Sequence, residues 1–127
     1  MNLLLDTCAL VWLGMGGGEL SRDAKRRIES APALYHSSIS AWEIARLAKE
    51  GKIDLAVPPG RFLSDLAEQY GLVSLPPDDA TMLRAAQLPD FHKDPADRII
   101  IATALLRDLM VVTGDARFPP YGVRTIC

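Results

Sequence analysis

The sequence has few of the features that mark secreted, membrane-bound or thiolate-metal proteins. Only two of its 127 residues are cysteines, Cys8 and Cys127, which excludes a disulfide framework and argues against a thiolate metal site. The N-terminus lacks the charged region, apolar stretch and cleavage site of a secretory signal, and no apolar run approaches the roughly 20 residues that span a bilayer. We therefore expect a cytoplasmic protein with no membrane partner.

Net positive charge is also absent. The 14 lysines and arginines are outnumbered by 16 aspartates and glutamates, so the formal net charge is -2. Neutralising nucleic-acid phosphates requires clustered basic side chains, and this balance therefore excludes a wholly basic, nucleic-acid-coating protein. Local basic patches remain compatible with the composition.

Apolar residues are plentiful, at 49% of a chain of typical domain length, and no repeat or long linker divides it. Residues 1–127 are therefore predicted to form one domain. Strand-like and helix-like segments alternate, which predicts an α/β fold: a three-layer α/β/α sandwich with a mainly parallel sheet of four to five strands. The predicted strands are Asn2 to Leu5, Leu34 to His36, Leu72 to Leu75, Met110 to Val112 and Val123 to Ile126; the predicted helices are Leu20 to Ser30, Ser40 to Glu50, Arg61 to Tyr70, Asp79 to Leu88 and Pro95 to Asp108.

Acidic residues occur where these elements should meet one edge of the sheet. Asp6 follows the first strand and Asp115 the fourth, while Glu43 and Asp97 each lie in the first turn of a predicted helix. Strand carboxyl ends and helix N-termini share one edge of a parallel sheet with right-handed crossovers. Four carboxylates there repel one another unless a cation compensates them, and oxygen ligands favour a hard cation. This pattern predicts a Mg²⁺ site, with Mn²⁺ as the alternative.

Each acid also has a structural interpretation when it is taken alone. Asp6 and Asp115 fit turn positions, and Glu43 completes a Ser-x-x-Glu capping box that starts at Ser40. Asp94 precedes a proline and fits the N-cap of the following helix. No single carboxylate decides between structure and function.

The joint pattern is more specific. The stretches "LLLDTCAL", "SSISAWEIARLAKEGKI", "HKDPADRIIIATAL" and "VVTGD" resemble the PIN-domain ribonucleases, especially the VapC-type toxins of bacterial toxin–antitoxin pairs. They match in residue type, order and spacing over nearly the whole chain. The resemblance implies that four acids are catalytic, namely Asp6, Glu43, Asp97 and Asp115. It also implies that the Thr113 hydroxyl assists them and that Asp94 is an auxiliary acid.

The function that the resemblance implies is a metal-dependent endoribonuclease toxin, neutralised by a cognate antitoxin and forming a homodimer. We predict that Asp6, Asp97 and Asp115 bind the metal ion, and that Glu43 orients or deprotonates the attacking water. Only two histidines are present, so no pair is placed for metal-free acid–base cleavage. His36 is interpreted as structural, and His92 as structural or as a substrate contact.

Three basic residues are the predicted RNA contacts. Arg46 and Lys49 are one turn apart on the helix that carries Glu43, and Arg98 adjoins Asp97. Solvated surface charge is the alternative for all three, and Arg46 also fits an ion pair with Glu43. Apolar residues on the helices from Ser40 and from Arg61 predict either a groove for an amphipathic antitoxin helix or ordinary core packing.

Two other functions compete with cleavage. A PIN-like module that binds RNA or a partner without cutting would not need the complete set of acids. A phospho-receiver switch also gathers acids around Mg²⁺, but it requires an adjacent acidic pair after the first strand and a lysine on a late strand. This chain has a lone Asp6 and, late in the chain, Arg124.

Overall fold

Five short strands form a central sheet in which every pairing is parallel. The computed structural model describes residues 1–127. The spatial order is β3-β2-β1-β4-β5, and β1 has Leu4 opposite Tyr35 on one side and Val111 on the other. This confirms the predicted parallel α/β fold. The strands are β1 (Leu3–Leu5), β2 (Leu34–Ser37), β3 (Leu72–Leu75), β4 (Met110–Val112) and β5 (Thr125–Ile126).

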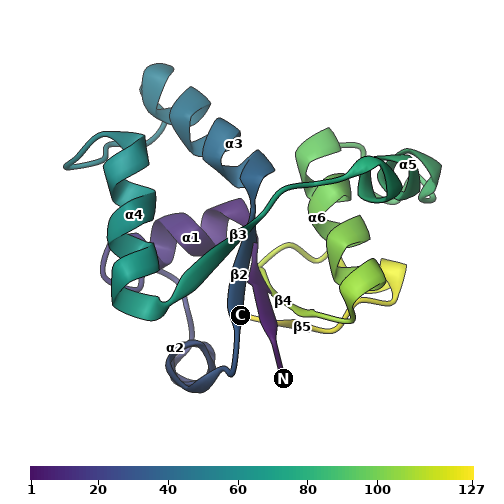
Figure 1. Ribbon diagram of the computed structural model, residues 1–127, viewed down its shortest axis with the longest axis horizontal. Helices are drawn as coiled ribbons and strands as arrows, with labels where there is room; N and C mark the ends of the chain where they lie inside the picture. Colours follow the sequence, from purple (N-terminus) through teal and green to yellow (C-terminus); the bar gives the residue numbers. More distant parts are fainter.

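Helices cover both faces of the sheet, which completes the predicted three layers (Figure 1). In Figure 1, α1, α2 and α4 lie on one side and α5 and α6 on the other, while α3 contacts α1, α4 and α6. None of the helices combines the length and apolar character needed to cross a bilayer. They are α1 (Thr7–Gly14), α2 (Arg22–Ser30), α3 (Ser38–Lys49), α4 (Pro59–Tyr70), α5 (Asp79–Gln87) and α6 (Pro95–Arg107), followed by a short 3-10 helix at Pro119–Tyr121.

The two cores lie on opposite faces of β1. Leu3 and Leu5 pack among α1, α2 and α4, whereas Leu4 points to the other face and packs with α6. Successive strand side chains alternate between faces, so a strand with a core on each side is apolar throughout. Both β1 and the isoleucine run of α6 are buried, and the side chains at their ends therefore lie on rigid elements.

Helix α1 is missing from the sequence-based prediction. Its residues are apolar on almost every side, so they lack the one-sided periodicity that identifies a surface helix. Asp6 starts this helix, because a side-chain oxygen of Asp6 accepts a hydrogen bond from the Ala9 N–H at 2.8 Å. Asp6 therefore ends β1 and caps α1 at the same time.

Helix α3 begins two residues earlier than predicted. Ser37 is the N-cap, and its hydroxyl accepts from the Ile39 N–H at 3.2 Å. Glu43 consequently lies in the second turn, so its predicted place in the first turn is wrong. The predicted capping box between Ser40 and Glu43 is also absent, since the Glu43 carboxylate is bonded elsewhere.

Candidate active site

The four predicted acids and Asp94 line one open cleft of about 500 Å³. They reach it from four separate parts of the chain. Asp6 and Asp115 follow β1 and β4, whereas Asp97 and Glu43 lie in the N-terminal halves of α6 and α3. The parallel topology thus brings these carboxylates to the carboxyl edge of the sheet.

Asp6 is the most enclosed of the four, with 5% of its surface exposed. Burial is the main cause that raises its pKa, and the nearby charges of Asp115 and Glu43 add to it, while hydrogen bonds from Thr113 and Ala9 act in the opposite direction. The buried Thr113 hydroxyl also accepts the Asp115 N–H at 3.0 Å. Thr113 therefore links the loop after β4 to the acid after β1.

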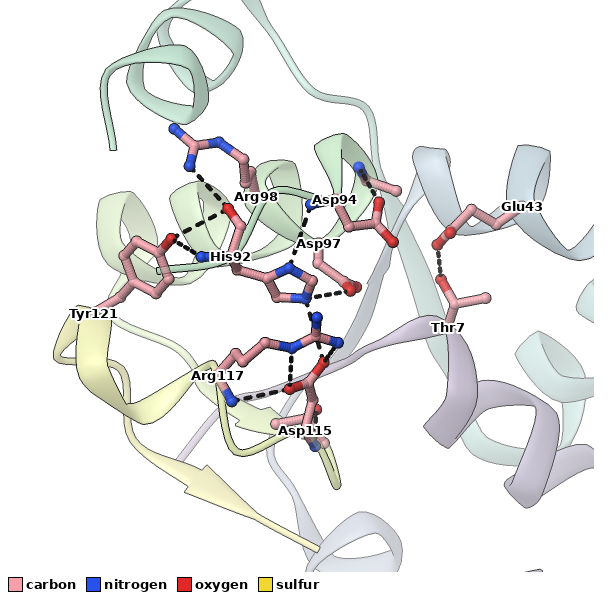
Figure 2. A network of polar contacts seen from close by, with 11 residues as sticks. Thr7, Glu43, His92, Asp94, Asp97, Arg98, Asp115, Arg117 and Tyr121 are labelled. Carbon is pink, nitrogen blue, oxygen red and sulfur yellow. Dashed lines mark hydrogen bonds and ion pairs between the residues drawn. The ribbon is translucent and has the colours of Figure 1, made fainter. Parts of the chain in front are cut away.

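Glu43 is oriented by a residue that the sequence analysis did not identify. The Thr7 hydroxyl donates to Glu43 (Figure 2). Thr7 Oγ1 also lies 2.9 Å from the Ser40 hydroxyl. Burial raises the pKa of Glu43. Thr7 directly follows Asp6, but its role becomes visible only once Thr7–Gly14 is known to be a helix that faces α3.

His92 lies inside the acid cluster. Its Nε2 atom is 2.8 Å from Asp97 Oδ2 and 3.2 Å from Asp115 Oδ2, and 1% of its side chain is exposed. Figure 2 shows the ring between the two carboxylates. The sequence analysis left His92 as a structural residue or a substrate contact, and its burial disfavours direct contact with a substrate.

Arg117 is a second residue that the sequence did not single out. Its Nε and Nη2 atoms donate to the two oxygens of Asp115 at 3.0 and 2.8 Å, and its main-chain N–H donates at 2.9 Å. These bonds lower the pKa of Asp115 to about 2. The only indication of this contact in the sequence is that a basic residue, Arg117, follows Asp115 by two positions.

Asp94 caps α6, as predicted, because its Oδ1 atom accepts from the Ala96 N–H at 2.9 Å. The chain geometry thus places a full set of acids around one cleft. A family model described as PIN domain matches residues 3–123.

The chain belongs to the PIN-domain family.

Known proteins resemble this PIN domain along most of its length. Ribonuclease VapC22 of Mycobacterium tuberculosis is 39% identical over 117 residues, which is 91% of this chain and 88% of that protein. A toxin–antitoxin complex from Klebsiella pneumoniae contains a chain that is 25% identical, with a TM-score of 0.64 over 89% of this chain and 86% of that one. VapBC2 of Rickettsia felis, bound to a DNA fragment from its promoter, has a TM-score of 0.73 at 14% identity, over 98% and 97% of the two chains. This last similarity shows the fold alone.

The donor set of this PIN domain fits a hard divalent cation. Burial, followed by the charges of Asp94, Glu43, Asp6 and Asp115, raises the pKa of Asp97 to about 7. The same environment raises the pKa of the Cys8 thiol to about 11. Both pKa shifts arise from excess negative charge in a cleft that is partly shielded from water. A cation bound by the carboxylate oxygens would neutralise this charge.

In the metal-free protein we expect stability to fall as the pH rises. The folded pKa of Asp97 is about 7, against an ordinary value of 3.8, so the folded state keeps a proton that the unfolded chain has already lost. This stabilisation is complete below about pH 4 and is lost as the pH rises through about 7, on the order of 2–4 kcal/mol. The melting temperature in EDTA should therefore fall between about pH 5 and pH 8, and added Mg²⁺ should raise it most at the higher pH.

The control for this prediction is Asp97→Asn, which keeps the shape of the side chain but cannot ionise. Its melting temperature in EDTA should change less with pH than that of the parent protein. A parent protein that becomes more stable between about pH 5 and pH 8 in EDTA would contradict the predicted direction.

The predicted basic contacts differ in their surroundings. Arg46 lies over the Trp42 ring, 5.2 Å from its centroid, and pairs with Glu50 at 3.1 Å; the predicted pair with Glu43 is absent. Lys49 is exposed and forms no ion pair. Both residues belong to α3, which borders the cleft.

Arg98 is placed differently from the prediction. It is 9% exposed and points into the junction between α5 and α6 rather than toward the acids. Its guanidinium donates to main-chain carbonyls at the end of α5 and in the following loop, so no donor is directed at RNA. The prediction of an RNA contact is not supported by this geometry. The accepting carbonyls are those of Ala85, Ala86, Leu88, Pro89 and His92.

Proposed function

We propose that this PIN domain is a metal-dependent endoribonuclease that hydrolyses RNA phosphodiester bonds. The observation that carries the proposal is the meeting of buried and half-buried, mutually repelling carboxylates from four chain segments in one open cleft. Its 39% identity to Ribonuclease VapC22 supports RNA as the substrate class.

Asp6, Asp97 and Asp115 would hold Mg²⁺ or Mn²⁺ directly or through its waters, with Asp94 as an auxiliary acid. When bound, the cation lowers the pKa of a water and offsets the charge that grows on the phosphate oxygens. Arg117 keeps Asp115 ionised, and the Thr113 hydroxyl supports Asp6.

Glu43 would act on the attacking water. The Thr7 hydroxyl holds the Glu43 carboxylate in place. The raised pKa of Glu43 makes this carboxylate a better proton acceptor than that of an exposed glutamate. Glu43 accepts the proton of the water as the new O–P bond forms. In-line attack then breaks the bond between phosphorus and the 3′-oxygen, and the leaving 3′-oxygen takes up a proton from solvent water, which leaves a 5′-phosphate and a 3′-hydroxyl.

The test is cleavage of a structured RNA by the purified protein with Mg²⁺ or Mn²⁺. We expect internal cuts that carry 5′-phosphates and that disappear when EDTA is added. RNA binding without any cleavage in either metal would refute the proposal and favour the non-cutting module.

Arg46 and Lys49 remain our proposed phosphate contacts. Replacing Lys49 by Gln should raise KM by a few-fold, with little change in kcat, because the ammonium neutralises substrate charge without touching the reacting atoms. Lys25→Gln on α2, outside the cleft lining, is the matched control. An equal loss in both variants would show that the effect is not local.

A toxin role, with neutralisation by an antitoxin, is proposed from the similarity to the Klebsiella pneumoniae complex. An apolar groove of about 650 Å³ between the end of α1, residues 54–57 and α4 offers a place for an amphipathic helix. Leu55→Asp in this groove should weaken neutralisation and preserve RNA cleavage. Unchanged neutralisation would show that the antitoxin binds another face of the protein.

We also propose the homodimer that the resemblance implies. Large apolar side chains on three elements are exposed by roughly half or more, namely Trp42 of α3, Val73 of β3 and Leu83 of α5. Burying them against a second copy would stabilise the protein. Light scattering at micromolar concentration tests this, and a monomer mass would reject it.

A further inference from the structure

His92 contacts two of the clustered acids, Asp97 and Asp115, and the proposed cleavage does not use it. The geometry points to His92 as a positioning residue whose Nε2–H lies beside the Asp97 and Asp115 carboxylates and orients them for a shared cation. This inference rests on the proposed metal-dependent function. It assigns His92 the role of a hydrogen-bond donor to the metal-holding acids, and excludes the role of metal ligand.

The main-chain contact at the other ring nitrogen decides the tautomer. His92 Nδ1 accepts the Asp94 N–H at 3.3 Å, so Nδ1 must offer a lone pair and cannot carry a proton in this arrangement. Nε2 lies 2.8 Å from Asp97 Oδ2 and 3.2 Å from Asp115 Oδ2, and the Asp115 carboxylate, which Arg117 keeps ionised, offers only lone pairs. A bare nitrogen would be repelled there, and the proton therefore belongs on Nε2.

The same contact argues against Nε2 as a ligand for the cation. An imidazole that binds a metal through Nε2 must give up the proton on that atom and carry it on Nδ1. That proton would point at the Asp94 N–H, so two donors would face each other. His92, Asp97 and Asp115 do lie close enough to share an ion, but the imidazole presents a donor to the group.

The ring is fixed independently of the acids. The His92 N–H donates to Tyr121 Oη at 2.7 Å, and Arg98 Nη1 donates to the His92 carbonyl at 3.0 Å. Phe118 packs against the ring edge-on, with the ring centroids 6.1 Å apart. Because main-chain hydrogen bonds already hold this loop, the Nε2–H is not needed to fix the ring and can donate a hydrogen bond to a carboxylate.

Nε2 itself has no aligned partner in this structure. It is fully buried, and neither carboxylate contact has the angle of a hydrogen bond. Carboxylates turn easily about their terminal bond, so a small rotation of Asp97 or Asp115 would align an oxygen with this N–H. A buried donor that lies within 3.2 Å of two acids, one from α6 and one from the loop after β4, would set their relative orientation once an oxygen of either acid turns into line with it.

The first test reads the tautomer in the parent protein by long-range ¹H–¹⁵N NMR, near pH 8, without metal and with Mg²⁺. We expect a proton on Nε2 and none on Nδ1 of His92, and we expect the Nε2 proton to remain when Mg²⁺ is added. A proton on Nδ1, or loss of the Nε2 proton on adding Mg²⁺, would overturn the proposal and make His92 a ligand. This readout does not depend on ribonuclease activity.

The second test compares two variants by Mn²⁺ titration calorimetry. His92→Phe keeps the ring volume but has no donor, and we expect it to weaken Mn²⁺ binding by about tenfold or more. His92→Gln keeps an N–H donor and should retain most of the affinity. Equal affinity for the parent protein and His92→Phe would refute the positioning role, whereas absence of RNA cleavage by the parent protein would refute the proposed function alone.

Discussion

Replacing Asp6 by Asn is expected to reduce RNA cleavage by about 100- to 1,000-fold while leaving the fold intact. Asp6 is 5% exposed at the base of the acidic cleft, between the hydroxyl of Thr113 and the first turn of α1. Asn has the same shape but no charge, so it removes the electrostatic attraction for the cation. Single-turnover cleavage in Mg²⁺ measures the loss.

The structural role of Asp6 makes Asn the appropriate substitution. The side chain caps α1 through the Ala9 N–H, and an Asn side-chain oxygen accepts the same hydrogen bond. Asp6→Ala loses the cap as well as the charge, and should therefore be less stable than Asp6→Asn by about 1 kcal/mol. An Asp6→Asn variant that cleaves RNA at the parent rate would reject Asp6 as a metal ligand.

Replacing Arg98 by Met is expected to give the largest loss of stability, about 3–5 kcal/mol, because several buried acceptors lose their donor. The buried guanidinium donates to five main-chain carbonyls in and after α5, and Met leaves these acceptors without a donor. Each unsatisfied buried acceptor costs free energy because water cannot replace the lost bond. Urea unfolding followed by circular dichroism measures the change.

Arg124→Met is the matched control for Arg98→Met. Arg124 pairs with Asp108 at 2.7 Å, but the two side chains are 54% and 91% exposed. An exposed pair contributes less than about 1 kcal/mol, so this variant should be nearly as stable as the parent protein. Similar losses in the two variants would show that the carbonyl network of Arg98 is not the source of its effect.

The sequence was sufficient for the strands and for the identity of the acids. β3 and β4 have the predicted bounds, because short apolar runs between turn residues leave few alternatives. Helix α1 was missed because its exposed positions also carry apolar residues, so the helix has no polar face and hence no helical period. The start of α3 was misplaced because Ser37, Ser38 and Ser40 are all good N-caps, and only the backbone direction after β2 selects Ser37.

The roles of the basic residues could not be read from their position in the sequence. Arg98 adjoins Asp97, and this suggested an RNA contact, yet neighbouring helix residues point about 100° apart. Arg98 therefore faces α5 while Asp97 faces the cleft. Arg117 lies beyond the last acid of the motif, and nothing in the sequence indicated that its side chain folds back onto Asp115.

By itself the sequence determined which carboxylates meet, because a parallel sheet brings strand ends and helix starts to one edge whatever the details of packing. Only the tertiary structure decided what surrounds each carboxylate: Thr7 beside Glu43, His92 between Asp97 and Asp115, and Arg117 on Asp115. Hydrogen bonds act over about 3 Å and depend on side-chain direction. Those distances are set by packing between residues far apart in the chain, and local sequence patterns do not record them.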